Sequence, residues 1–207
     1  MGTREERSAM AHSPPELVDW IDARGRTLAS LPRAEIRRRN LLHRVTATFV
    51  FHPDGRVFVH QRSPGKDVYP GLFDPCVGGT VVSGESYRAN ACREVGEELG
   101  VRGVPLYPLF GHTFRDAVTA SRVRVFACVY DGPLRFQPEE VVDGCWMNEE
   151  ALAARIAAGS VCPDSVQAWG RYRARWGAGR NFAREVAPGL ASFDCAAATA
   201  QDAASPS

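Results

Sequence analysis

Residues 78–101 read GGTVVSGESYRANACREVGEELGV. The part from 86 to 99 is rich in Ala, Glu and Arg, which favour a helix. Gly100, directly after it, is typical of a residue that ends a helix. The part before it contains three glycines and no helical periodicity, which indicates a loop. The segment therefore predicts a glycine-rich loop that leads into a helix.

Three carboxylates share one face of this helix, because Glu94, Glu97 and Glu98 stand at i, i+3 and i+4. Like charges at these spacings destabilise a helix, so the pattern indicates a compensating cation. Magnesium would serve, since it prefers oxygen ligands, commonly one or two carboxylates together with substrate phosphates. The glycines of the preceding loop permit close backbone approach, and a carbonyl there could be a further ligand. The alternative is a solvated acidic helix face.

A structural ion pair is also expected at this helix. Arg93 lies beside the glutamates, and Glu85 stands eight residues earlier, at the start of the helix. A guanidinium fork between them would hold the loop against the helix and keep the carboxylates in position, which a lysine would do less well.

Taken together, the segment resembles the Nudix box, G-x5-E-x7-R-E-U-x-E-E-x-G-U, in which U is aliphatic. All nine fixed positions, from Gly79 to Val101, are matched at the family's spacing. The resemblance implies an α/β (α+β) fold, a Nudix-type α/β/α sandwich with a mixed β-sheet. It also implies that the helix glutamates ligate magnesium or manganese, joined by the Gly78 carbonyl, and that Glu85 and Arg93 orient them.

The same resemblance implies a metal-dependent hydrolase that cleaves a diphosphate linkage in a nucleoside diphosphate-linked or related small substrate. The metal ions would neutralise the diphosphate, polarise a phosphoryl oxygen and lower the pKa of an attacking water. Glu94 or a glutamate from a later loop would accept its proton. Glu139 and Glu140, just before the strand-like segment VVDGCWM, are the candidates for a base or an extra ligand. A charged turn after Pro138 is the alternative.

A rival function follows from the stretch between His43 and Gly79, which is similar to the isopentenyl diphosphate isomerase branch of the superfamily. Those isomerases carry a catalytic Cys followed two residues later by a metal-binding His. Alignment on YPGLFDPCVGGTVV puts Gly78 and Thr80 at these positions, and Cys76 lies two residues too early. A complete box favours hydrolysis over isomerisation. A non-catalytic nucleotide-binding module, which should have lost one of the box glutamates, is less favoured still.

Contacts to the substrate are predicted for a small set of residues. Phosphate binding is expected from basic side chains, and stacking on a base from aromatic ones. The candidates are His43, Arg62, Lys66, Phe73 and Phe114, with Phe110, His112 and Arg115 as further residues of the cleft. For each aromatic residue, ordinary core packing is the alternative. For His43 the alternative is a structural hydrogen bond.

Along the rest of the chain, patterns predict strands and helices in a mixed order. We expect two short strands in 16–31, a helix in 33–40, a hairpin in 45–62, strands at about 107–115 and 121–130, and helices in 148–158 and 163–176. This organisation predicts a flexible N-terminus over 1–15 and one domain over 16–176, with its core at about 40–160. Residues 177–207 are predicted to be a C-terminal extension, with the last 20 or so residues disordered.

Composition narrows the class of protein. The 207 residues carry a formal net charge of +1, so no nucleic acid polymer is expected as a partner. The arginines at 37–39 and at 171, 173 and 175 are interpreted as solvated helix faces. No apolar run is long enough to span a membrane, and no secretory signal is evident. The six cysteines show no metal-site spacing, and we predict free thiols in the cytoplasm. A homodimer through the strands of 16–31 is a further prediction.

Overall fold

The computed structural model describes residues 15–195. The strands are β1 (Leu17–Ile21), β2 (Thr27–Pro32), β3 (His43–Phe51), β4 (Val57–Arg62), β5 (Phe73–Asp74), β6 (Cys76–Val77), β7 (Tyr107–Arg115), β8 (Ala120–Val129) and β9 (Val141–Met147). The helices are α1 (Arg33–Arg38), α2 (Tyr87–Leu99), α3 (Glu149–Ala157) and α4 (Pro163–Trp176), followed by the short turns η1 (Phe182–Val186) and η2 (Ala187–Gly189). The elements expected from the sequence are all present within a few residues of their predicted bounds. Residues 1–14 of the predicted flexible N-terminus lie outside the described residues.

The main sheet is mixed, as predicted, and β3 lies at its centre. It pairs in parallel with β8 over its whole length, while β8 pairs antiparallel with β7. The turn expected in 45–62 forms, but β3 and β4 are paired only at Phe51 and Val57. Beyond that point β4 pairs with β9, and β6 pairs with β3. The sheet is therefore forked between β3 and β4, and the segment that leads to the glycine-rich loop joins β3 within the fork.

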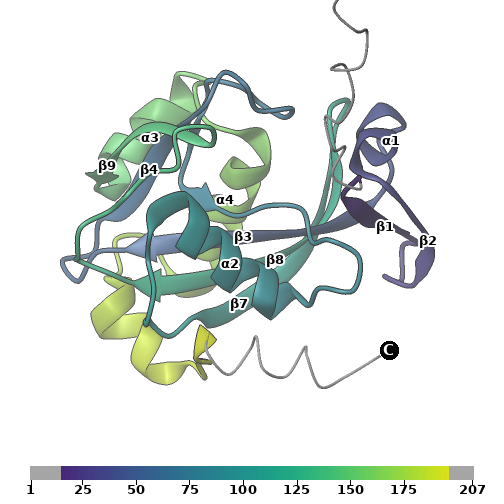
Figure 1. Ribbon diagram of the computed structural model, residues 1–207. Coiled ribbons are helices and arrows are strands. Elements are labelled where there is room, and N and C mark those ends of the chain that lie inside the picture. The colour runs from purple at the N-terminus through teal and green to yellow at the C-terminus, as the bar shows by residue number, and fades with distance from the viewer. Residues whose placement is uncertain (1–14, 196–207) are drawn as a thin grey trace, which may run out of the picture.

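Both faces of the sheet are covered by helices, which confirms the predicted sandwich. Successive residues of β3 point to opposite faces, so Phe49 and Phe51 belong to one core and Val50 to the other. Helix α2 contributes Val95 and Leu99 to the core that contains Val50. Helices α3 and α4 cover the opposite face, and Figure 1 shows α2 and α4 on the two sides of the sheet.

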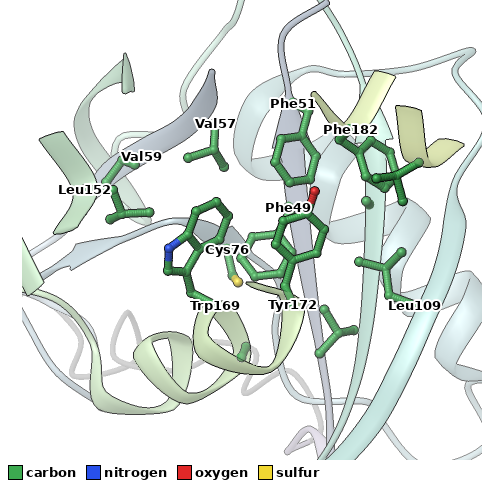
Figure 2. Packing of buried hydrophobic residues seen from close by; sticks show 14 of the residues in the cluster. Phe49, Phe51, Val57, Val59, Cys76, Leu109, Leu152, Trp169, Tyr172 and Phe182 are labelled. Atoms are coloured by element: carbon green, nitrogen blue, oxygen red, sulfur yellow. The ribbon is translucent and has the colours of Figure 1, made fainter. Parts of the chain in front are cut away.

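The core under α4 is built largely from aromatic rings. Phe49, Phe51, Trp169 and Tyr172 contact one another at centroid distances between 5.3 and 6.4 Å. Figure 2 shows these rings between the strands and α4, with Phe182 stacked on Phe51 from beyond the end of the helix. Such a core fixes α4, and with it the residues at the start of α4, against the sheet.

The first strands and α1 form a separate layer beside the main sheet. Strands β1 and β2 pair antiparallel with each other. Ser83 N donates to the Leu17 carbonyl at 2.8 Å, and Arg33 N donates to the Glu16 carbonyl at 2.9 Å. These bonds hold α1 near the glycine-rich loop. Dimerisation through this hairpin stays a prediction.

Two predictions about the C-terminal part are wrong. Residues 188–195 are ordered against the domain rather than disordered: Phe193 exchanges backbone hydrogen bonds with Leu106 and packs edge-on against Phe126. Phe182 is fully buried, so the folded domain extends past residue 176. The apolar residues of this segment are few, but Leu190 and Phe193 pack against the two cores. Residues 196–207 lie outside the described chain.

The prediction of six free thiols is also wrong. Cys92 of α2 is joined by a disulfide to Cys195, 103 residues later. A pair so far apart leaves no spacing signal, and only the return of the C-terminal segment to α2 brings the two together. Cys76, Cys128 and Cys162 are free and buried, as expected for small core residues. Within residues 15–195, no helix is long and apolar enough to cross a membrane.

Candidate active site

Helix α2 begins and ends where local chemistry requires it. The Ser86 hydroxyl accepts from Ala89 N at 3.2 Å, which caps the first turn. Gly100 has φ 70°, the left-handed conformation that ends a helix and that glycine adopts most easily. The turn that carries the three glutamates therefore has a fixed position relative to both helix ends.

Arg93 binds three carboxylates at once. Its Nε and Nη2 donate to Glu85 at 3.0 and 3.2 Å, which is the predicted fork between helix and loop. Its Nη1 donates to Glu97 Oε2 at 2.9 Å, and Nη2 lies 2.9 Å from Glu94 Oε1. Because these carboxylates raise its pKa, Arg93 stays charged. The guanidinium therefore offsets the repulsion within the helix turn.

Asn90 completes the link between the loop and the helix. Its side chain is fully buried, and its Nδ2 donates to the Thr80 carbonyl at 3.0 Å and to Glu85 at 2.9 Å. Its Oδ1 accepts from the Thr46 hydroxyl of β3. Asn90 was not among the residues predicted for the site. The available signal is its place one helical turn before Arg93 and Glu94, on the face that carries the glutamates.

Gly78 and Gly79, at the start of the box, allow the loop to lie against both β3 and α2. A Cβ at Gly79 would lie 2.5 Å from Glu94 Oε1, and one at Gly78 would lie 2.1 Å from the Thr46 carbonyl oxygen. Thr46 N donates to the Gly79 carbonyl at 3.0 Å, so that carbonyl is used in the sheet. The carbonyl of Gly78 is then the better candidate for a ligand, as predicted.

Lys66 links the helix to the loop before β9. Its Nζ lies 3.8 Å from Glu98 Oε1 and makes a close ion pair with Glu140. Burial raises the pKa of Glu98 to about 8, against the opposing effect of Lys66, and burial also raises the pKa of Glu94. Both carboxylates therefore lack enough nearby positive charge. Of the two predicted bases, Glu140 adjoins the helix glutamates, while Glu139 is exposed.

A cavity adjoins this cluster on the other side of the Gly78–Gly79 loop. Four basic side chains line it: Arg33 and Arg37 of α1, Arg62 of β4, and Lys66. Its walls also include Asp74 from β5 and residues at the start of α4. Arg62 and Lys66 therefore lie where phosphate binding was predicted. Arg62 donates to the Val68 carbonyl at 2.9 and 3.1 Å and to Asp74 at 3.4 Å.

His43 is a structural residue that contacts this cavity only indirectly. It is buried, its Nδ1 lies 2.9 Å from the Leu41 carbonyl, and its Nε2 lies 3.3 Å from Arg37 Nη1. Burial, followed by Arg37, lowers the pKa of His43 to about 4, so the ring is neutral at pH 7. Nδ1–H therefore donates to the carbonyl, and the Nε2 lone pair accepts from Arg37. His43 positions Arg37 and is not itself among the residues that line the cavity.

The predicted stacking residues lie elsewhere. Phe114 is buried in the core, and Phe73 and Phe110 pack against the same core. His112 is buried near Arg171, and Arg115 is exposed. None of these five residues lines the cavity beside the box. Core packing, the alternative considered for the aromatic residues, is what the structure supports.

The donor set suits a hard divalent cation, since it consists of carboxylates beside a loop carbonyl. Two of these carboxylates, Glu94 and Glu98, are largely buried and short of positive charge. Across residues 15–195, however, no three side chains of the His, Cys, Asp or Glu type are gathered closely enough to hold an ion. The carboxylates are instead paired with Arg93 and Lys66. The ligand types therefore suit a divalent cation, and Arg93 and Lys66 would compete with that cation for the carboxylates.

Arg37 is a residue that sequence reasoning assigned wrongly. It belongs to the run of arginines at 37–39, which was interpreted as a solvated face. Arg38 and Arg39 fit that interpretation, since both pair with Glu35 at the surface. Arg37 instead points into the cavity, one helical turn from Arg33. The i, i+4 spacing of the two arginines was the available signal.

Comparisons with known proteins agree with this geometry. The NUDIX domain family model matches residues 41–164. A Nudix hydrolase of Pseudomonas aeruginosa is 39% identical over 166 residues, covering 79% of this chain and 98% of that protein. The Nudix hydrolase YfcD of Escherichia coli K12 is 34% identical over 153 residues, covering 74% of this chain and 84% of its own.

Solved structures give the same result. The crystal structure of DR0079 from Deinococcus radiodurans has a TM-score of 0.62 and 31% identity, covering 71% of this chain and 92% of that one. The NUDIX domain of Shewanella oneidensis NrtR, solved with ADP ribose, has a TM-score of 0.53 at 20% identity, covers 70% of this chain and 99% of its own, and supports the fold. The chain therefore belongs to the Nudix hydrolases, a family that cleaves pyrophosphate linkages and generally uses divalent metal ions.

Proposed function

We propose that this protein hydrolyses the diphosphate linkage of a nucleoside diphosphate-linked or related small substrate with Mg²⁺ or Mn²⁺. Glu94, Glu97 and Glu98 would hold the cation together with the Gly78 carbonyl. The observation that carries this proposal is the Arg93 fork, which joins Glu85 of the loop to Glu94 and Glu97 of α2. A cation bound there would neutralise the diphosphate and polarise a phosphoryl oxygen.

The residues of the chain would divide the remaining work. Arg93 and Glu85 would keep the helix glutamates in position, and Arg62 and Lys66 would bind phosphate oxygens at the cavity. Glu140 is the better candidate for the proton acceptor or an extra ligand, because it shares Lys66 with Glu98. When a cation and substrate bind, Lys66 is free to turn from the two carboxylates to the phosphates.

The isomerase alternative is less well supported. Gly78 and Thr80 replace the Cys and His that its chemistry needs. Burial raises the pKa of Cys76 well above its ordinary value, which disfavours a reactive thiolate. A binding-only module is also less well supported, since each box glutamate is retained and is held by an ion pair.

The test is a Mg²⁺-dependent assay on a panel of diphosphate compounds, with products identified. Glu97→Gln should lower kcat by ~10²-fold or more, since it removes a negatively charged metal ligand with little change in shape. Glu150→Gln, on an exposed part of α3, is the matched control and should leave kcat unchanged. Equal rates for wild type and Glu97→Gln would refute the assignment of the site.

A further inference from the structure

Two arginines reach the cavity from a helix outside the matched family domain. Arg33 and Arg37 lie on α1, whereas the family model begins at residue 41. Because they are four residues apart, they lie on the same face of the helix, and both line the cavity beside Gly78 and Gly79. The N-terminal layer therefore adds positive charge to a site whose metal-binding part is supplied by α2.

Arg37 differs from the other three cations of this cavity. Its guanidinium contacts only neutral groups: Thr80 Oγ1 at 2.9 Å, Thr119 Oγ1 at 3.2 Å and His43 Nε2 at 3.3 Å. Its Nε is buried and has no hydrogen-bond partner. Within residues 15–195, no carboxylate lies within 4 Å of it. By contrast, Arg33 pairs with Glu16, Arg62 with Asp74, and Lys66 with Glu98 and Glu140.

A largely buried guanidinium without a carboxylate in direct contact is costly, and burial lowers the pKa of Arg37 to about 10, with Arg33 adding to the effect and Asp67 opposing it. These three contacts use three of the five N–H donors of the guanidinium, which leaves donors for an oxyanion. His43, Thr80 and Thr119 hold the guanidinium in place without neutralising it. The arrangement is therefore complete except for an anion.

The cavity walls indicate what kind of molecule would bring that anion. The hydroxyl-bearing residues Thr80, Thr119 and Ser121 line it together with three aspartates, and none of the lining residues among 15–195 is aromatic. The aspartates are Asp67, Asp74 and Asp164. Stacking on a nucleobase would need an aromatic ring or a free guanidinium plane. Hydroxyls and guanidinium groups instead suit a phosphorylated, hydroxyl-rich group.

We propose that Arg37, assisted by Arg33, binds a phosphoryl group of the substrate other than the two joined by the cleaved linkage. The substrate would then be a sugar or polyol diphosphate that carries a further phosphate. The assignment of this site to the substrate rests on the proposed function. Phosphate binding at Arg37 can be measured independently of turnover.

The first experiment measures binding of inorganic phosphate to the full chain in EDTA by isothermal titration calorimetry. Arg37→Gln should weaken binding by about 10-fold or more, because it removes a charge-assisted contact. Arg33→Gln should weaken it by several-fold. Arg38→Gln lies on the same helix, is paired with Glu35 at the surface and should bind like wild type. Equal binding by wild type and Arg37→Gln would overturn the proposal. If Arg37→Gln does not fold, equal binding by Arg33→Gln, whose side chain is 37% exposed, would overturn it.

The second experiment compares ribose 1-diphosphate with and without a 5-phosphate as substrates. Wild type should show about 10-fold lower KM for the phosphorylated compound, and Arg37→Gln should lose that preference with kcat nearly unchanged. Equal KM values in wild type would overturn the assignment of the subsite to substrate. If wild type bound phosphate through Arg37 but hydrolysed no diphosphate, the proposed function would fail while the anion site stood.

Discussion

Two helix turns face this site, and each carries like charges four residues apart. On α2, the turn with Glu94 and Glu98 meets cations that the chain itself supplies, Arg93 and Lys66. On α1, the turn with Arg33 and Arg37 meets carboxylates only at Arg33; Arg37 has none within 4 Å among the described residues. Each glutamate of the first turn has a cationic partner in the free protein, whereas Arg37 of the second turn has no carboxylate partner among the described residues.

This difference separates the roles of the two turns. A divalent cation at α2 must displace ion pairs that already exist, so the site is held in shape before the cation arrives. An anion at α1 displaces no carboxylate from Arg37 and completes an arrangement held by neutral groups. The turn that would hold the cation is therefore positioned by ion pairs, and the turn that would hold the anion is positioned by hydrogen bonds to His43 of β3 and to loop residues.

The largest effect should come from breaking the ion pairs of Arg93 at α2. Arg93→Lys keeps the charge but loses the fork that contacts Glu85, Glu94 and Glu97 together. We expect kcat to fall by about 10²-fold, with a smaller change in KM, because the carboxylates are no longer held in position. Steady-state kinetics at saturating Mg²⁺ would measure it. Wild-type kcat in Arg93→Lys would mean that the fork does not position the glutamates.

A smaller effect is expected at the loop before β9, which Lys66 links to α2. Glu140→Gln should lower kcat by about 10-fold, because Glu140 shares Lys66 with Glu98 and is the better candidate for the base. Glu139→Gln is the matched control, one residue earlier and exposed. Should the two variants show the same kcat, Glu140 would have no special role.

The α1 side should be the more sensitive to acid, because neutral His43 supports Arg37. The pKa of His43 in the folded protein, about 4, is below the ordinary value of 6.5, so the unfolded chain binds the proton more readily. Its stabilising contribution is therefore complete above about pH 6.5 and is lost as the pH falls toward 4. The pKa values of buried His60 and His112 are lowered in the same way by burial.

Each of these histidines should contribute about 1 kcal/mol per pH unit to the loss of stability between pH 6.5 and 5. Chemical unfolding at several pH values would measure the slope. His43→Gln should reduce that slope. An unaltered slope in His43→Gln would show that His43 does not titrate as described.

The sequence predicted those features that depend on local pattern. The loop, the Gly100 cap and the Glu85–Arg93 fork all lie within one short stretch, where spacing alone determines which side chains meet. Strand and helix positions were predicted for the same reason. The forked pairing of β3 and β4 was missed because the turn between them is regular and the divergence depends on β6 and β9.

Features that depend on distant parts of the chain were predicted poorly. Phe73, Phe110 and Phe114 are typical base-stacking residues, but the register of the sheet and the position of α4 turn them into the core. Arg37 was grouped with Arg38, although adjacent helix positions point about 100° apart and only packing decides which one is buried. The Cys92–Cys195 disulfide depends on a C-terminal segment whose path no local pattern indicates.

The central claim is that the glutamates of α2 form a divalent cation site. Binding of Mn²⁺ to the full chain, followed by electron paramagnetic resonance, tests it directly and needs no substrate. Wild type should bind Mn²⁺, and Glu98→Gln should weaken that binding by about 10-fold or more, while Glu150→Gln should bind like wild type. Mn²⁺ binding of equal strength in wild type and Glu98→Gln, or none in wild type, would contradict the claim.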